Sequence, residues 1–185
     1  MESLLTHRFT LTTQNVDNLY IRAGHSLVRT LQIHGNMFQV RCASTSTDGT
    51  FFLPEGVTPT AKGSPLTGAA RQSLKCANCS SWLRPHVLWF DETYNERHYH
   101  HNSMIETAKR TRLLITVGTA GATTVPNQIV KRVISQGGLM FDINLADNLF
   151  AGLAMQSGRG IFIRRGSSEA LVALLPTMAS ATSNL

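Results

Sequence analysis

The most regular hydrophobic pattern lies in the second half of the chain. Residues 113–117 form a continuous apolar run with β-branched members, which is typical of a buried parallel strand. From Thr124 onward, apolar side chains recur at helical spacing until Gly137, and residues 139–143 form a second apolar strand that ends in Asn144. The pattern predicts a strand–helix–strand unit, whose carboxyl edge is where sheets of this type bind nucleotides.

The rest of the pattern is weaker and agrees with the same fold class. Short strands are expected at residues 8–12, 31–33, 37–41, 87–90 and 161–165, with helices within 94–112 and 170–175. By contrast, residues 43–74 are rich in Ser, Thr, Gly and Pro and show little periodicity, so a long loop is expected there. We therefore predict an α/β protein with a Rossmann-like parallel sheet.

Composition fits a globular protein with one sizeable core. The chain has 185 residues, of which 42% are hydrophobic and 15% charged. Its net charge is +6, but the positive residues are scattered, so nucleic-acid binding is not expected. Neither a signal peptide nor a membrane span is predicted, and three cysteines do not make a disulfide framework. A cytoplasmic protein is the expectation.

Candidate chemistry concentrates in residues 13–35. The amides of Gln14 and Asn15 and the carboxylate of Asp17 follow a strand and can hold a polar ligand. A second short strand leads to His34, whose imidazole can serve as a base beside them. Taken singly, Asn and Asp after a strand are more often turn formers, and a lone histidine is more often structural.

The order of these residues resembles the catalytic stretch of the sirtuins, the NAD-dependent protein deacylases. Thr-Gln-Asn-Val-Asp at 13–17, Arg-Ala-Gly at 22–24 and His-Gly at 34–35 occur in the order found in that family. The resemblance implies attack of an acyl-lysine oxygen on C1′ of the nicotinamide ribose of NAD, release of nicotinamide and formation of O-acyl-ADP-ribose. It makes His34 the general base and Asn15 a catalytic residue.

The same resemblance assigns NAD contacts to two parts of the chain. Nicotinamide and its ribose would contact four consecutive residues, Gln14, Asn15, Val16 and Asp17. The adenosine side would contact Gly118, Thr119, Ala120, Asn144 and Ser168. Ala120 replaces the serine that the family carries in this loop, which removes one hydroxyl. Taken alone, these glycines are equally consistent with simple packing positions.

An acylated-lysine protein substrate is expected to bind along residues 87–92. This stretch resembles the family element that pairs with the substrate peptide, and it assigns peptide contacts to Val87, Phe90, Asp91 and Glu92. Asp91 stands where glycine is usual in the best-known members and agrees with a bacterial-type branch.

Three cysteines suggest a small metal module. Cys76 and Cys79 form a C-x2-C pair, and Cys42 precedes them. The family places a four-cysteine structural zinc site here, and the missing partner would lie near Thr45 or Ser46. The alternatives are a degraded site that binds no metal and a zinc site completed by another residue.

The predicted organisation is an incomplete Rossmann-like sirtuin domain with an insertion. Residues 1–35 and 81–178 would form the NAD-binding domain, 36–80 an inserted zinc-ribbon-type module, and 179–185 a tail. The family's N-terminal strand, glycine-rich loop and helix are expected to be missing, because no such pattern precedes residues 8–12. Two alternatives to the deacylase stay open: a truncated, catalytically silent NAD-binding or interaction module, and a mono-ADP-ribosyltransferase or NAD hydrolase on the same fold.

Overall fold

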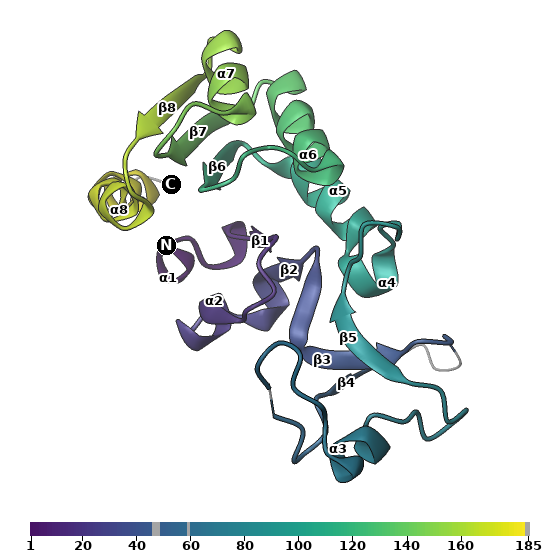
Figure 1. Cartoon of the computed structure of the whole chain (residues 1–185). Coiled ribbons are helices and arrows are strands. Elements are labelled where there is room, and N and C mark those ends of the chain that lie inside the picture. The colour runs from purple at the N-terminus through teal and green to yellow at the C-terminus, as the bar shows by residue number, and fades with distance from the viewer. Residues whose placement is uncertain (46–48, 59, 184–185) are drawn as a thin grey trace. The chain divides into compact units, whose positions relative to one another are not determined.

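The computed structural model describes residues 1–45, 49–58 and 60–183 (Figure 1). The chain divides into two compact units. Unit 1 joins Met1–Leu11 to His101–Leu185, and unit 2 is Thr12–His100. The predicted inserted module, residues 36–80, falls wholly within unit 2. Its separation from a Rossmann-like domain stays a prediction.

Unit 1 contains a three-stranded parallel sheet and the helices that accompany it. Its elements are α1 (Glu2–Leu5), η1 (Thr6–Arg8), α5 (His101–Arg110), β6 (Leu113–Val117), α6 (Thr124–Ser135), β7 (Leu139–Asn144), α7 (Leu149–Gln156), β8 (Gly160–Arg164) and α8 (Ser167–Ser183). The strand order is β6-β7-β8, and both pairs are parallel. The predicted strand–helix–strand unit and the predicted fold class are confirmed.

A cluster of apolar side chains joins the helices of unit 1 to its sheet. Val130 of α6, Met140 of β7, and Phe150 and Ala154 of α7 are buried together. Their spacing follows the helical and strand periods that the sequence shows, so burial of this face stabilises the unit. The sheet thereby fixes where β6 and β7 end, which is where the candidate nucleotide loops begin.

The prediction that β6 is a buried strand is wrong in part. Leu113 and Val117 are exposed, and the three residues between them are half-buried. The physical reason is position, because β6 pairs with β7 and is an edge strand among the described residues. An apolar run predicts a strand, but it does not report whether the strand has neighbours on both sides.

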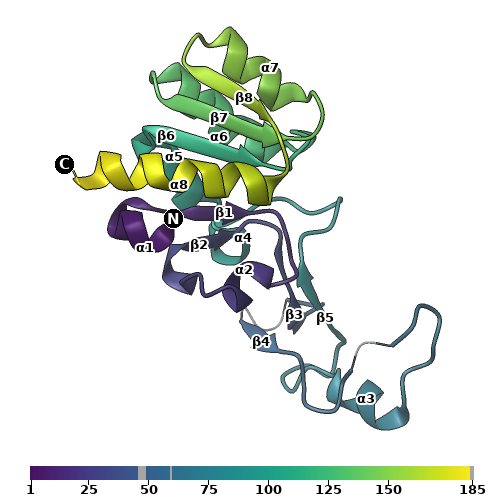
Figure 2. The same cartoon turned by 90° about the vertical axis from the view of Figure 1, so that its left-hand side faces the viewer.

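Helix α8 is longer than the predicted closing helix. Figure 2 shows it as one long helix that follows β8, and it continues to Ser183. Residues 179–183, assigned to a tail from sequence, are therefore helical. In the part of the chain that the structure describes, no helix is long and apolar enough to cross a membrane.

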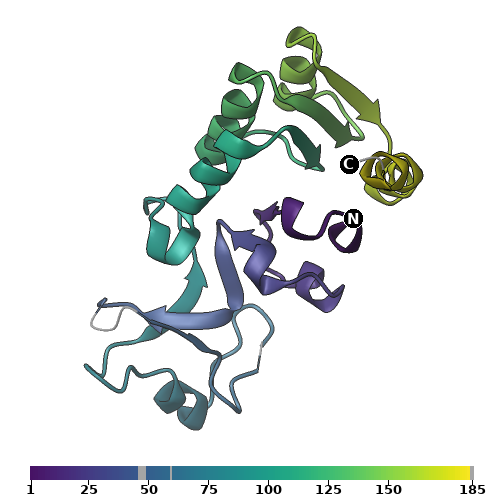
Figure 3. The same cartoon turned by 180° about the vertical axis from the view of Figure 1, so that it is seen from behind.

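Unit 2 combines short helices with an antiparallel sheet (Figure 3). Its elements are β1 (Leu11–Thr13), which crosses the boundary between the units, α2 (Leu19–Arg22), η2 (Leu27–Arg29), β2 (Thr30–Gln32), β3 (Gly35–Cys42), β4 (Thr50–Phe52), α3 (Gly68–Ser73), β5 (Leu83–Val87) and α4 (Glu96–Tyr99). β1 pairs with β2, and β3 lies between β4 and β5.

The expected long loop at residues 43–74 contains two short elements, β4 and α3. Strand β4 has three residues, all exposed, and it pairs with β3. Helix α3 has six residues, and the Thr67 hydroxyl caps it by accepting from the Ala70 N–H at 3.2 Å. Neither element is long enough to show a hydrophobic period, so the sequence pattern could not reveal them.

The strand expected at residues 87–90 lies earlier in the chain. β5 covers Leu83–Val87 and includes Pro85, opposite Val40 of β3. β5 is an edge strand, where the missing N–H of proline leaves no ladder partner unsatisfied. Residues 88–90 therefore follow the strand and are available for a loop.

Candidate functional site

His34 lies between β2 and β3 in unit 2, with both ring nitrogens in polar contact. Its Nδ1 is 3.1 Å from the Gln14 carbonyl oxygen, and its Nε2 is 2.7 Å from the Tyr94 hydroxyl. Burial lowers the pKa of His34 below its ordinary 6.5, and the Gln14 carbonyl opposes this in part. The imidazole is therefore mainly neutral at pH 7, which is the state that a general base requires.

The glycine that follows His34 has a structural reason. Gly35 adopts φ +84°, and a Cβ there would lie 2.1 Å from the His86 carbonyl oxygen. Gly35 pairs with Val87, and the Leu88 N–H donates to the His34 carbonyl at 3.0 Å. The close approach of β3 to β5 fixes the backbone from which the His34 ring projects.

The predicted nicotinamide-side residues form a turn whose backbone is tied to the strands. Gln14 reaches His34 as described. The Asn15 N–H donates to the Thr13 hydroxyl at 3.1 Å, and the Val16 carbonyl accepts from the Met37 N–H at 3.0 Å. The Asp17 carboxylate accepts from the Leu19 N–H at 3.0 Å. The structure thus brings Gln14 against His34.

A partly buried cluster of side-chain amides lies next to this turn, and sequence reasoning missed it. Asn36 donates to the Asn18 side-chain oxygen at 2.8 Å and to the Gln32 side-chain oxygen at 3.3 Å. Asn36 is buried, and Asn18 adopts a left-handed backbone with φ +59°. Asparagine is among the few residues that tolerate this conformation, which was the available signal.

The four predicted peptide-contact residues differ in their surroundings. Val87 ends β5 and is half-buried, whereas Phe90 and Asp91 are exposed in the following loop. Glu92 is instead engaged by other side chains within unit 2.

The Glu92 carboxylate holds its loop in place through two guanidinium groups. It pairs with Arg41, and it accepts from Arg84 at 2.8 Å and from the Trp89 N–H at 2.9 Å. Burial alone would raise the pKa of Glu92, but these hydrogen bonds and positive charges outweigh burial and lower the pKa to about 2. Glu92 is ionised throughout the physiological range and shapes the loop that carries Phe90.

The three cysteines converge as the sequence predicted. The sulfur atoms of Cys42, Cys76 and Cys79 all lie within 4.8 Å of one another, and the Cys42 and Cys79 sulfurs are 3.6 Å apart. Three thiols at this separation fit a tetrahedral zinc ion with one position left for another ligand. The donor set therefore suits a structural metal.

A serine that the sequence analysis did not single out lies beside two of the three sulfur atoms. The Ser44 hydroxyl lies 3.1 Å from the Cys79 sulfur and 3.2 Å from the Cys42 sulfur. Of the two positions expected to supply the missing ligand, Thr45 donates its hydroxyl to the Ser44 carbonyl at 2.7 Å. Ser46 lies outside the described residues.

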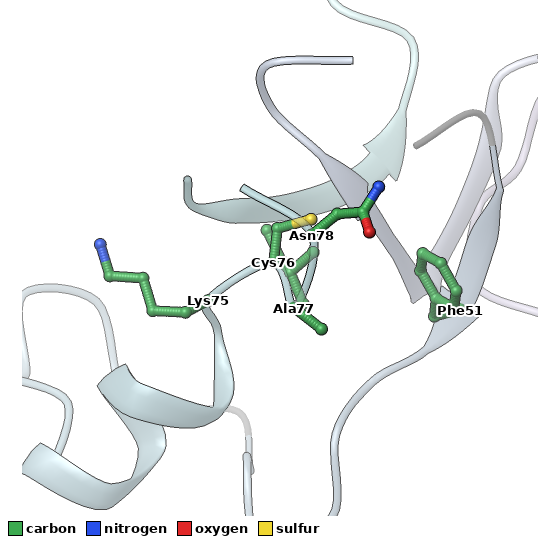
Figure 4. Close-up of a pocket in the computed structure, with 6 residues that line it drawn as sticks. Phe51, Lys75, Cys76, Ala77 and Asn78 are labelled. Carbon is green, nitrogen blue, oxygen red and sulfur yellow. The ribbon is translucent and has the colours of Figure 1, made fainter. Parts of the chain in front are cut away.

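A cavity of about 320 Å³ lies beside this cysteine cluster (Figure 4). Its lining residues are Phe51, Lys75, Cys76, Ala77, Asn78 and Leu83. The lining is mostly apolar, and the Lys75 ammonium instead lies over the Trp82 ring at 3.4 Å. None of the predicted NAD or peptide residues contributes to this cavity, so it belongs to the cysteine module.

The predicted adenosine-side residues lie in unit 1, at or just beyond the carboxyl ends of the parallel strands. Gly118 follows β6 with φ +62°, and its N–H donates to the Ile143 carbonyl at 2.9 Å. Asn144 is the last residue of β7, and its side-chain amide donates to the Thr119 carbonyl at 3.0 Å. The two loops are thus tied together at the edge where parallel sheets bind nucleotides.

The two remaining adenosine-side residues flank this arrangement. Ala120 follows Thr119 in the loop after β6 and contributes no hydroxyl, and Ser168 lies exposed in the first turn of α8. Beneath the loops, the fully buried Asp142 carboxylate accepts from Thr116 and from Asn148, which also caps α7. Sequence reasoning did not identify this polar support.

The parallel sheet of unit 1 and the loops at its carboxyl edge have the arrangement of a Rossmann-like α/β fold. The sequence profile of the Sir2 family matches residues 3–125. The chain therefore belongs to the Sir2 family, the sirtuins, as the motif order in residues 13–35 suggested.

Individual relatives agree with this assignment. The chain is 32% identical over 167 residues to an NAD-dependent protein deacylase of Leptospira interrogans serovar Lai, covering 90% of this chain and 59% of the relative. It is 30% identical over 164 residues to an NAD-dependent protein deacylase of Pyrococcus furiosus, covering 88% of this chain and 58% of the relative. The chain thus spans about 59% of the length of these relatives.

A solved structure of a Sir2 homologue in complex with NAD has the same fold. It matches with a TM-score of 0.75 and 26% sequence identity, covering 97% of this chain and 62% of that one. The predicted Rossmann-like fold is confirmed by this match.

Proposed function

We propose that the chain is an NAD-dependent protein-lysine deacylase that transfers the acyl group to ADP-ribose with release of nicotinamide. The observation that carries the proposal is the position of the His34 imidazole, whose Nδ1 lies 3.1 Å from the carbonyl oxygen of Gln14 at the start of the Gln14–Asp17 turn. The motif order of the chain resembles that of the sirtuins, and relatives that are 32% and 30% identical to this chain are named NAD-dependent protein deacylases.

In this proposal His34 accepts a proton from a ribose hydroxyl of the bound dinucleotide. General-base catalysis of this kind contributes about 10²–10⁴-fold to a rate. Bound NAD supplies the ribose carbon to which the acyl oxygen adds as nicotinamide leaves. Asn15 and Asp17 orient the nicotinamide end, with Gln14 and Val16 shaping the turn around the ribose.

The adenosine end of NAD is proposed to bind the loops of unit 1. Gly118 and Asn144 are supported by their place at the carboxyl edge of the parallel sheet. Thr119, Ala120 and Ser168 complete the proposed set. Backbone N–H groups at such a turn favour phosphate and ribose oxygens.

The proposed substrate is a protein with an acylated lysine. An extended peptide would lie along the end of β5, with Val87, Phe90 and Asp91 in contact and Glu92 holding the loop. The exposure of Phe90 and the anchoring of Glu92 support this assignment. The proposed location is the cytoplasm, where thiols such as Cys42, Cys76 and Cys79 stay reduced and able to bind zinc.

Product analysis tests the proposal. The chain is incubated with NAD and an acetyl-lysine peptide, and the products are identified by mass spectrometry. Deacylation predicts unmodified peptide and O-acetyl-ADP-ribose in equal amounts. ADP-ribose without loss of the acetyl group would indicate an NAD hydrolase, and ADP-ribosylated peptide would indicate a transferase.

A silent NAD-binding module is the second candidate, and one observation favours it. Ala120 removes a hydroxyl from the adenosine-side loop, which weakens a contact that the family makes. Calorimetry with NAD on this chain, together with the product assay, separates the candidates. Clear NAD binding without any product would support the silent module.

A further inference from the structure

Both nitrogens of the His34 ring have assigned partners, and this fixes where its proton lies. The Gln14 backbone carbonyl can only accept, so Nδ1 carries the hydrogen and donates to it at 3.1 Å. Nε2 then bears the lone pair. The Tyr94 hydroxyl, 2.7 Å away, is the group that donates to this lone pair.

Tyr94 is itself held in place by the packed part of unit 2. Its ring meets the ring of Tyr99 edge-on, with centroids 6.3 Å apart. Tyr99 is 1% exposed, and its hydroxyl accepts from Arg41 at 3.2 Å. Tyr94 also follows closely after Glu92, whose carboxylate is fixed by two arginines. The phenol therefore meets His34 from an anchored loop.

The carboxylate in the Gln14–Asp17 turn is engaged away from the His34 ring. The Asp17 carboxylate accepts from the Leu19 N–H. Among the described residues, the contacts of the His34 ring are those with Gln14 and Tyr94, and Tyr94 is the titratable partner.

We infer that Tyr94 is a positioning residue for the proposed deacylase reaction. The Gln14 carbonyl makes Nε2 of His34 the basic atom, and the Tyr94 hydroxyl holds the ring by donating to this lone pair until a ribose hydroxyl takes the place of the phenol. The hydrogen bonding of His34 with Tyr94 rests on geometry alone. The replacement of the phenol by a ribose hydroxyl rests on the proposed function. Tyr94 is assigned no contact with NAD or with the acyl-lysine.

The geometric part is tested on the unmodified chain by ¹⁵N NMR of its histidine side chains. The His34 signals are assigned by their loss in His34→Gln. Above the pKa of His34, we expect a protonated-type Nδ1 and an unprotonated-type Nε2. A spectrum in which Nε2 carries the hydrogen would overturn the inference, and this measurement needs no variant of Tyr94.

The role of Tyr94 is tested by titrating His34 in Tyr94→Phe. A hydrogen bond to Nε2 stabilises the neutral ring, so its removal is expected to move the pKa of His34 upward. Tyr20→Phe is the matched control, because it removes a phenol hydroxyl of the same unit that contacts Asn18. The control is expected to leave the pKa of His34 unchanged.

The outcomes separate the two proposals. An unchanged pKa of His34 in folded Tyr94→Phe would remove Tyr94 from its positioning role and leave the deacylase proposal standing. Absence of O-acetyl-ADP-ribose in the product assay would contradict the deacylase proposal. The hydrogen bonding of His34 would still be decided independently by the ¹⁵N NMR spectrum.

Discussion

Gly35 is the residue at which backbone conformation and packing constrain the candidate site most tightly. A left-handed backbone conformation costs an alanine about 1–2 kcal/mol. We predict that Gly35→Ala lowers the free energy of unfolding by more than this. The added cost comes from the Cβ, which would lie 2.1 Å from the His86 carbonyl oxygen. Urea unfolding measures the difference.

Gly24→Ala is the matched control for this prediction. Gly24 has φ +89°, but a Cβ there would meet nothing within 4 Å. It shares the conformational cost without the steric overlap. Equal losses of unfolding free energy in the two variants would show that the close approach of β3 to β5 is not the constraint.

Glu92 gives a pH dependence whose sign can be stated. Its folded-state pKa, about 2, lies below its ordinary 4.5. The unfolded state therefore binds more protons in this window, and the stabilisation that is present above pH 4.5 is lost as the pH falls toward 2. The contribution is about 1–2 kcal/mol after allowance for screening by solvent.

We predict that Glu92→Gln lowers the unfolding free energy at pH 7 and flattens its pH dependence between pH 4.5 and 2. Urea unfolding at several pH values measures both. Glu106→Gln is the control, because Glu106 pairs with Lys109 on an exposed face. A Glu92 variant that behaves like this control would contradict the proposed anchoring role.

At the residue scale, the sequence predicts what a contiguous motif carries. His34 and Gln14 were predicted because the order of their motif resembles that of the sirtuins, and the three cysteines because a C-x2-C pair with a further cysteine suggests a metal module. Tyr94 could not be predicted, since it lies 60 positions from its partner His34 and belongs to no pattern. Ser44, which lies beside two of the sulfur atoms, was not singled out because serine is not a usual zinc ligand.

At the scale of elements, the best predictions are those with a long hydrophobic period. β6, α6 and β7 match their expected ranges closely, because each buries an apolar stripe or run of its own. By contrast, β4 is held by pairing with β3, and α3 by the Thr67 cap. These interactions leave almost no signal in the sequence pattern. β5 was misplaced because Pro85 reads as a strand breaker, although an edge strand accepts it.

The cysteine cluster is the element-level feature with a direct test. We predict that the chain binds one zinc ion and that a chelator lowers its melting temperature, because metal bound to the folded state stabilises it. Cys79→Ser should lose both the zinc and the response to chelator. Elemental analysis and thermal melts provide the measurements.

Ser44→Ala refines the zinc prediction. If the Ser44 hydroxyl contributes to the fourth position, this variant should bind zinc more weakly than the unmodified chain does. If the chain contained no zinc and its melting temperature were the same with and without chelator, three thiols would not suffice to bind the ion and the site would be a degraded one.

At the scale of the whole molecule, the family and the fold class followed from sequence, whereas the division into units did not. Unit 1 joins Met1–Leu11 to a segment that begins 90 positions later, at His101. No composition shift marks either boundary. The residues that we propose for the two ends of NAD belong to different units.

The central claim is that His34 is the base of an NAD-dependent deacylation. Its most direct test is the rate of O-acetyl-ADP-ribose formation from NAD and an acetyl-lysine peptide, measured for the unmodified chain, His34→Ala and the exposed control His7→Ala. We predict product from the unmodified chain, an unchanged rate in the control, and a loss of about 10²-fold or more in His34→Ala. Equal rates in the two variants, or no product from the unmodified chain, would contradict the account.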